Sequence, residues 1–294
     1  MSIDRRARAF TTLRGLSIGD AFGSCFATPA NHPAPQSRSL PEGPWRWTDD
    51  TEMACSIVAI LLRYGHIDQG ALADSFAERW DIYRQYGPGT NRILRLLRQN
   101  RATWRELAPR VRHGQGSWGN GASMRVAPLG AFFADNLDRV VVEATASAQI
   151  THTHPEGVAG AVAVAVAAAL AVSAPALSGY DLLDNIAAHT PPSMVRTAMA
   201  KSRALLQKPD VRTAARLLGS GARVSAPDTV PFCLWITAAY PDNYAEALWS
   251  TASVGGDVDT TCAIVGGILA ARLGLDAIPD EWATRAEPLP GWVE

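Results

Sequence analysis

Apolar side chains recur every three or four positions along much of this chain, which is the spacing of an amphipathic helix. The segment after Thr51 follows it closely, with apolar residues at positions 53, 54, 57, 58, 60, 61 and 62. Arg63 and Gly65 then provide a basic last turn and a helix stop. The same spacing appears at residues 71–83, 92–97, 137–150, 180–188, 193–206, 230–240, 244–254 and 260–273. No clean alternating strand with a hairpin turn is present, so the pattern predicts helices.

The most apolar stretch, residues 157–172, consists mainly of alanine and valine. It is shorter than the roughly 20 residues that span a bilayer, and we expect it to form a buried central helix. Segments rich in proline, glycine and polar residues separate the helices at 28–44, 86–89, 113–121 and 227–228. None of them is long enough to be a domain linker. The sequence therefore predicts an all-α fold, with residues 1–294 forming a single compact orthogonal multi-helix bundle.

Composition and charge narrow the class of protein. The 294 residues are 47% hydrophobic and 19% charged, as in ordinary globular domains, and the net charge is -1. No long run of Lys or Arg indicates a nucleic-acid or membrane-surface partner. The basic N-terminus is not followed by the apolar segment of a secretory signal. We expect a cytoplasmic monomer.

The four cysteines, Cys25, Cys55, Cys233 and Cys262, are scattered along the chain and form no CxxC pair. Cysteines spaced in this way, in a protein expected to be cytoplasmic, are typical of reduced core residues. We therefore expect all four to be buried and unpaired.

The first candidate for chemistry is the run Thr48, Asp49, Asp50 and Thr51, directly before a predicted helix. Threonine and aspartate at such a position can simply cap the helix and interact favourably with its dipole. A helix cap requires only one side-chain acceptor, however, and this run has two adjacent carboxylates flanked by two hydroxyls. Like charges side by side are unfavourable unless a cation compensates them.

A second acidic run, Asp257, Asp259 and Thr260, follows two glycines and precedes the last long predicted helix. Within a helix, residues two apart lie on different faces, so these carboxylates can converge only at a loosened helix entry. Carboxylate and hydroxyl oxygens favour Mg²⁺ or Mn²⁺ over zinc. Together with Asp49 and Asp50, four carboxylates are enough for two cations.

Two other motifs overlap this second run. A calcium-binding EF-hand loop starting at Asp257 requires Gly at its sixth position and Glu at its twelfth, where this chain has Cys262 and Ile268. The run also matches the DxDxT motif of aspartyl-phosphate phosphatases, with Asp257 as nucleophile. That motif follows a buried strand and opens a doubly wound α/β domain, whereas only 35 residues follow Asp259. The phosphatase remains a distant alternative.

A third region combines the glycine-rich segment 118–125 with Thr151, His152 and His154. Glycine lets the backbone approach a ligand, and Asn120 and Ser123 offer donors and acceptors. Such a loop suits phosphate or ribose oxygens, although an ordinary tight turn would look the same. The two histidines lack further ligands at zinc-site spacing.

Taken together, these segments resemble the ADP-ribosylglycohydrolase family. Five ordered motifs carry the resemblance over nearly the whole chain, at residues 15–23, 48–51, 119–128, 150–155 and 256–260. The resemblance implies an all-α fold with a centre for two Mg²⁺ ions, or Mn²⁺. The implied metal ligands are Thr48, Asp49, Asp50, Asp257, Asp259 and Thr260. The residues implied to lie along the ADP-ribose are Asn120, Gly121, Ser123 and His152.

The implied activity is removal of ADP-ribose from an ADP-ribosylated protein or small molecule, by cleavage at the anomeric carbon of the distal ribose. Glycoside cleavage there passes through an oxocarbenium-like transition state. Bound metal ions would orient the ribose hydroxyls and lower the pKa of a water. Asp49 or Asp50 is the candidate catalytic group that assists this water. Asp20 is either a second acid near the site or a hydrogen-bond acceptor that stabilises a helix.

Two departures from the family pattern affect the proton-transfer group and the scissile linkage. Many members carry a Glu at the position we align with Ala27, and some arginine-specific members carry an Asp in the loop that is here 86–90. An inactive ADP-ribose-binding protein, such as an immunity or scaffold protein on the same fold, is therefore the main alternative.

Overall fold

The computed structural model describes residues 4–27 and 35–293, and within these ranges the chain forms helices and no β-strand. A single parallel bridge pairs Trp45 with Ala286. The all-α prediction is confirmed. The first three residues, the last one, and residues 28–34 of the predicted 28–44 connection lie outside the described ranges.

The α-helices are, in chain order, α1 (Arg5–Ser24), α2 (Asp49–Tyr64), α3 (Gln69–Arg79), α4 (Pro88–Arg98), α5 (Trp104–Leu107), α6 (Val111–Gly114), α7 (Ala127–Phe132), α8 (Leu137–Gln149), α9 (Pro155–Ser173), α10 (Gly179–His189), α11 (Met194–Leu205), α12 (Val211–Leu218), α13 (Ala226–Ala239), α14 (Tyr244–Ala252), α15 (Val258–Leu273) and α16 (Asp280–Arg285). Short 3-10 turns are η1 (Pro35–Ser37), η2 (Ile82–Arg84), η3 (Ala108–Arg110), η4 (Asn120–Ala122), η5 (Leu275–Ala277) and η6 (Gly291–Val293).

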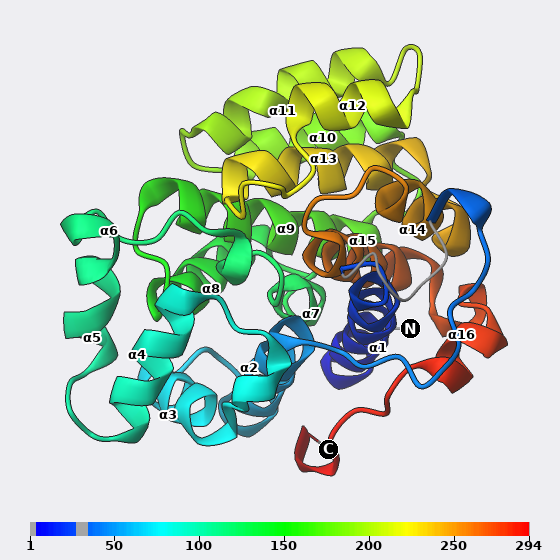
Figure 1. Ribbon diagram of the computed structural model, residues 1–294. Helices are drawn as coiled ribbons and strands as arrows, with labels where there is room; N and C mark the ends of the chain where they lie inside the picture. Colours follow the sequence, from blue (N-terminus) through cyan, green and yellow to red (C-terminus); the bar gives the residue numbers. More distant parts are fainter. Residues whose placement is uncertain (1–3, 28–34, 294) are drawn as a thin grey trace.

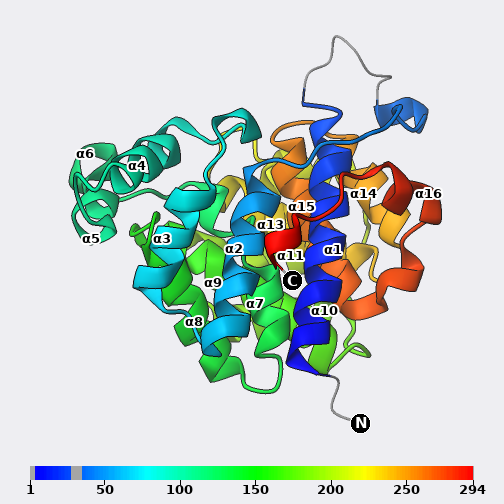
Figure 2. The ribbon, with the colours of Figure 1, turned by 90° about the horizontal axis from the view of Figure 1, so that it is seen from below.

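Helices α1, α9 and α15 lie in the middle of the molecule, with α10 to α13 on one side and α2 to α8 on the other (Figure 1). The short helices α4, α5 and α6 lie together at one edge (Figure 2). Among the described helices, α9 is long and apolar enough to cross a membrane by length and composition, and 78% of that stretch is buried inside the protein. The predicted central helix is confirmed.

The close contact between α1 and α15 depends on glycine. A Cβ atom at Gly15 would lie 2.1 Å from the Cβ of Ala270, and one at Gly19 would lie 2.3 Å from the carbonyl oxygen of Cys262. A Cβ at Gly23 would lie 2.5 Å from the carbonyl oxygen of Val258. Since these glycines are four residues apart, they form a stripe along one face of α1. This stripe brings the start of α15 against the end of α1.

The structure differs from the expected boundaries in several places. Residues 227–228 were expected in a connection but lie in the first turn of α13, where a proline loses no hydrogen bond. Helix α3 ends at Arg79, earlier than the predicted residue 83, because the backbone of Trp80 is not helical. The short helices α5, α6, α7, α12 and α16 were not predicted. Each spans eight residues or fewer, which is too short for a clear apolar period.

All four cysteines are buried and free of disulfide bonds. Cys55, Cys233 and Cys262 are completely buried, and Cys25 is 8% exposed. The prediction of buried, unpaired cysteines is confirmed.

The glycine stripe leads to a prediction about stability. Gly19→Ala places a methyl group against the backbone of α15, so we expect a loss of about 1–3 kcal/mol in the free energy of unfolding. Gly70→Ala, in the exposed first turn of α3, meets no atom closer than 3.4 Å and serves as the control. Alanine favours a helix there, so the control should keep or gain stability. Urea unfolding measures both, and equal stability of the two variants would contradict the close-packing argument.

Candidate active site

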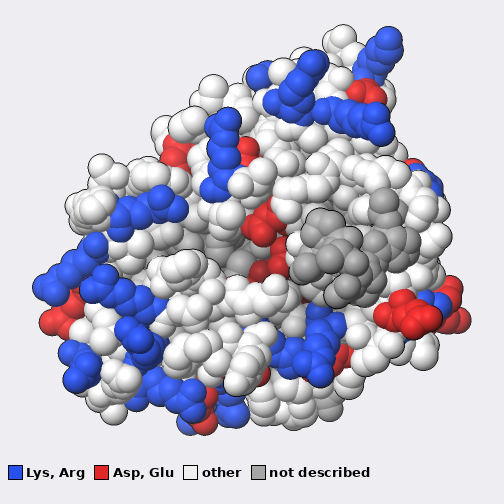
Figure 3. Space-filling model, in the orientation of Figure 1, with Lys and Arg blue, Asp and Glu red and all other residues white. Residues whose placement is uncertain are grey.

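Four aspartates from two distant parts of the chain meet in one cavity. Asp49 and Asp50 begin the first turn of α2, while Asp257 occupies the N-cap position of α15 and Asp259 lies in its first turn. All four line a cavity of about 520 Å³. Acidic side chains gather in the hollow near the centre of the face shown in Figure 3, and most basic side chains lie toward the edges. The structure thus brings together the two acidic motifs that the sequence singled out.

Asp20 holds the first acidic motif from behind. Its carboxylate is completely buried and accepts hydrogen bonds from the backbone N–H groups of Thr48 (2.9 Å) and Thr51 (3.1 Å). The hydroxyls of Thr48 (2.8 Å) and Thr51 (2.5 Å) donate to it as well. Burial raises the pKa of Asp20 to about 7, against the lowering effect of these hydrogen bonds. Asp20 is not part of the cavity lining, and its contacts are those of the helix-stabilising acceptor.

Helix capping does not account for the acidic cluster. Thr48 caps α2 by accepting from the backbone N–H of Asp50, and Asp257 makes no side-chain cap bond to α15. The carboxylate of Asp257 instead accepts a hydrogen bond from the Asn120 amide at 2.6 Å. The Oδ2 atom of Asp50 is buried and has no hydrogen-bond partner. These acids therefore have oxygens that the helix ends do not use.

Burial is the main cause of the raised pKa values in this cluster. It raises the pKa of Asp49 and of Asp50 well above the usual range, and the neighbouring carboxylates raise both further. Burial, followed by the charge of Asp259, raises the pKa of Asp257 to about 7. Removing carboxylates from water and placing them together disfavours their charged forms, and a nearby cation reverses this effect.

The donor set suits a hard divalent cation. Among the described residues, no three Asp, Glu, His or Cys side chains already converge closely enough to hold an ion. Four aspartates and Thr260 nonetheless line the same cavity, and Oδ2 of Asp50 is buried without a hydrogen-bond partner. An all-oxygen set with excess negative charge fits Mg²⁺ and does not fit zinc. Thr48 lies outside the lining, with its hydroxyl bonded to Asp20.

The predicted glycine-rich segment forms one wall of the cavity. Asn120, Gly121 and His152 all line it, and the Asn120 amide also donates to the hydroxyl of Thr229 at 3.1 Å. Ser123 is different: it is completely buried, outside the lining, and near Gly160 of α9, where a Cβ would lie 2.7 Å from its hydroxyl oxygen. The structure brings three of the four predicted substrate-binding residues to the cavity.

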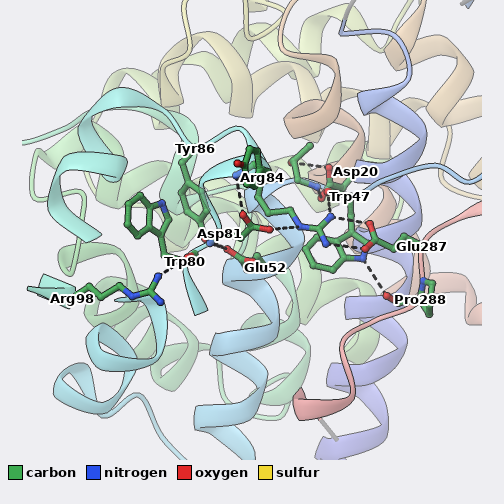
Figure 4. Close-up of polar contacts among 12 residues, drawn as sticks. Asp20, Trp47, Glu52, Trp80, Asp81, Arg84, Tyr86, Arg98, Glu287 and Pro288 are labelled. Carbon is green, nitrogen blue, oxygen red and sulfur yellow. Dashed lines mark hydrogen bonds and ion pairs between the residues drawn. The ribbon is translucent and has the colours of Figure 1, made fainter. Parts of the chain in front are cut away.

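A second part of the lining, residues 85 and 87–90, is supported by one buried and one partly exposed acid contact that the sequence did not reveal (Figure 4). The Tyr86 hydroxyl donates to the carboxylate of Glu52 at 2.6 Å. Arg84 forms two hydrogen bonds with Glu287, each 2.8 Å long. Arg84 also donates to the carbonyl oxygen of Trp47 at 2.9 Å, and its guanidinium lies 3.3 Å from the centre of the Trp47 ring. This wall is thereby joined to α2 and to the C-terminal segment.

A third part of the lining comes from the segment between α12 and α13, which sequence reasoning also missed. Val224 lines the cavity, and the carbonyl oxygen of Ser220 accepts a hydrogen bond from the Asp257 N–H at 3.2 Å. Gly221 has a φ of 81° and lies against Asp257, where a Cβ would come within 2.6 Å of the aspartate Cβ. The two glycines Gly219 and Gly221 were the available signal for such a turn.

The structure also bears on two other sequence-based interpretations. Ala27, at the position aligned with the family glutamate, is exposed and outside the cavity lining. The phosphatase alternative for Asp257 requires a preceding strand in an α/β domain, but within residues 4–27 and 35–293 there is no strand. Asp257 follows a loop and begins a helix, so the phosphatase interpretation is wrong.

Comparison with known proteins gives a consistent result. The family model described as ADP-ribosylglycohydrolase matches residues 1–294. ADP-ribosylarginine hydrolase Tri1 from Pseudomonas putida is 26% identical, with 95% of this chain and 74% of the relative covered. ADP-ribosylhydrolase ARH3 from Bos taurus is 27% identical, with 82% of this chain and 74% of the relative covered.

A solved structure described as an ADP-ribosylglycohydrolase-related protein complex has the same fold, with a TM-score of 0.71 and 24% identity over 97% of this chain and 93% of that chain. The family model spans every motif that meets in the cavity, including both acidic runs and the glycine-rich wall. The chain therefore belongs to the ADP-ribosylglycohydrolase family.

Proposed function

We propose that this protein is a Mg²⁺-dependent hydrolase that cleaves ADP-ribose from an ADP-ribosylated protein or small molecule at the anomeric carbon of the distal ribose. The observation that carries the proposal is the cavity itself. Four carboxylates from the starts of α2 and α15 face a wall formed by Asn120, Gly121 and His152. A concave site that combines clustered acids with fixed hydrogen-bonding groups is typical of an enzyme.

The residues that would hold the cations are Asp49, Asp50, Asp257 and Asp259, with Thr260, because all five line the same cavity and carry oxygen donors. When bound, Mg²⁺ would supply a water of lowered pKa and a charge that orients the ribose hydroxyls. Thr48 would support the metal ligands without contacting the cations, since its N–H and hydroxyl hold the start of α2 against Asp20. Asp49 and Asp50 are the candidates for assisting the attacking water, because both line the cavity and Oδ2 of Asp50 has no partner.

The ADP-ribosyl group would lie along the glycine-rich wall. Gly121 lets the ligand approach the backbone, and Asn120 and His152 present polar groups beside it. The wall at 85–90 contains Gln85 and Thr90 but no acid. Because this wall shares the cavity with the carboxylates, it would contact the leaving group, and its chemistry would select the linkage.

The first test is hydrolysis of a panel of substrates that carry ADP-ribose on arginine, on serine, on an acetyl ester and on a nucleic-acid base. We expect release of free ADP-ribose from at least one substrate with Mg²⁺ or Mn²⁺, loss of activity with EDTA, and poor rescue by Zn²⁺. Turnover that persists in exhaustively chelated buffer would rule out the role of the metal. Binding of ADP-ribose without release from any substrate would instead support the inactive binding protein.

Metal binding should also stabilise the fold, because a cation relieves the repulsion between the buried carboxylates. A ligand that binds only the folded state adds about 2.7 kcal/mol at a hundredfold excess over its dissociation constant. We expect a higher melting temperature in millimolar Mg²⁺, measured by calorimetry. The same curve with and without saturating Mg²⁺ would mean that the acidic cluster does not hold a cation.

Substitution at Asp259 separates a metal ligand from a helix cap. Asparagine has nearly the same shape and caps helices about as well as aspartate, so Asp259→Asn leaves a cap intact but removes one charge from the cluster. We expect weaker Mg²⁺ binding by titration calorimetry and loss of turnover, with the fold retained. Asp280→Asn at the exposed start of α16 is the matched control and should change neither quantity. Wild-type metal affinity and turnover in Asp259→Asn would remove this residue from the site.

A further inference from the structure

Arg125 is a buried cation that forms no salt bridge among the described residues, although the charge of Asp49 acts on it. It is 0% exposed. Its guanidinium donates to the sulfur of Met53 (3.2 Å), the carbonyl oxygen of Ser147 (3.1 Å) and the hydroxyl of Thr151 (2.9 Å), and it lies 4.6 Å from the centre of the Phe76 ring. Burying a charge in such surroundings is unfavourable, so its position calls for an explanation beyond packing.

The Thr151 hydroxyl joins this cation to His152. Thr151 lines the cavity and is 1% exposed as a residue. Its hydroxyl oxygen lies 2.9 Å from Nη2 of Arg125 and 2.7 Å from Nδ1 of His152. Arginine can only donate, so the hydroxyl oxygen accepts from Arg125. The single hydroxyl hydrogen then has one acceptor among the described residues, which is Nδ1 of His152. If Nδ1 carried a proton instead, this buried hydroxyl hydrogen would have no partner, at a cost in free energy.

The imidazole is therefore protonated on its other nitrogen. Burial, together with the charges of Arg125 and Arg112, lowers the pKa of His152 to about 3, so the ring is neutral at ordinary pH. With Nδ1 as acceptor, the proton is on Nε2, which has no hydrogen-bond partner among the described residues. The ring edge faces two cavity-lining glycines: a Cβ at Gly119 would lie 3.1 Å from Nε2, and one at Gly121 would lie 3.0 Å from Cε1.

We propose that Arg125 and Thr151 are positioning residues that hold His152 as its neutral Nε2–H tautomer and so direct a fixed N–H donor into the cavity. The chain of hydrogen bonds runs from Arg125 to Thr151 to His152, and its last free donor faces the glycine-rich wall. That donor suits an oxygen of the bound ADP-ribosyl group, an assignment that rests on the proposed function. The tautomer itself follows from the contacts and holds without it. Arg125 can only donate hydrogen bonds, so it fixes the direction of this series of hydrogen bonds. A neutral side chain that can also accept would leave the direction open.

The tautomer can be measured directly by ¹H–¹⁵N NMR of protein labelled on its six histidines, with His152→Gln used to assign the signal. We expect Nδ1 of His152 to show the ¹⁵N shift of an unprotonated nitrogen and Nε2 that of an N–H. Thr151→Val and Arg125→Met should each give a mixture of tautomers. Thr151→Val removes the hydroxyl that donates to Nδ1 of His152. Arg125→Met removes the donor to that hydroxyl, which can then accept from Nδ1 instead. Thr151→Ser keeps the hydroxyl and should restore the wild-type spectrum.

Affinity for free ADP-ribose, measured by titration calorimetry, provides the second readout. We expect Thr151→Val to weaken binding about tenfold, or about 1.4 kcal/mol, and Thr151→Ser to restore it. Thr190→Val removes another buried hydroxyl, outside the cavity lining and bonded only to the carbonyl oxygen of Ile186, and should change neither readout. If Thr151→Val does not fold, Arg125→Met tests the same series of hydrogen bonds. This variant should fold, because it replaces a buried cation by an apolar side chain.

Each outcome decides one claim. A wild-type His152 protonated on Nδ1 would overturn the proposal, as would an unchanged tautomer and affinity in Thr151→Val and Arg125→Met. If the tautomer responds to these variants while free ADP-ribose does not bind to the wild type, the positioning of His152 by Arg125 and Thr151 is supported and the proposed function is contradicted. Equal weakening of binding by Thr151→Val and Thr151→Ser, with no change in the tautomer, would mean that Thr151 contributes only to packing.

Discussion

The close contact between α1 and α15 is the constraint on which the rest of the structure depends. Gly15, Gly19 and Gly23 remove the side chains that would otherwise separate the two helices, and each faces backbone or Cβ atoms of α15 at distances that no Cβ could occupy. The contact sets where α15 begins, and Asp257 and Asp259 are placed with it. The same helix α1 carries Asp20, which fixes the start of α2. One pair of helices therefore determines where both acidic motifs lie.

The acidic cluster is unfavourable by itself, and the surrounding structure maintains it. Burial and mutual repulsion raise the pKa values of Asp49, Asp50 and Asp257. The starts of α2 and α15 hold these carboxylates in place, and helix packing such as the α1–α15 contact keeps the two helix starts together. Sites that store unfavourable electrostatics in this way are typical of catalytic and ion-binding centres. The cost is offset when a cation or a substrate binds.

Polar contacts behind the cavity determine the orientation of its walls. On one side, Glu52 and Glu287 hold Tyr86 and Arg84, so residues 85–87 and the first turn of α4 that follows them have a fixed position. On the other side, Arg125 and Thr151 orient His152. In both cases a charged group outside the cavity lining supports a lining segment through another residue. The precise placement of the residues that line a functional site commonly depends on such supporting contacts.

The sequence by itself determined the helical class, the buried α9, the two acidic motifs and the glycine-rich segment, because each is encoded within a short window. The spacing of apolar residues indicates the buried face of a helix, and acidic residues beside glycines indicate the start of a helix. Only the tertiary structure decided that Asp20 lies behind the cavity, that Ser123 faces α9, and that Glu52, Arg84 and Glu287 support a wall. These roles join residues such as Arg84 and Glu287, which are 203 positions apart. No local pattern encodes them, because a side chain acquires its partners only when the helices pack.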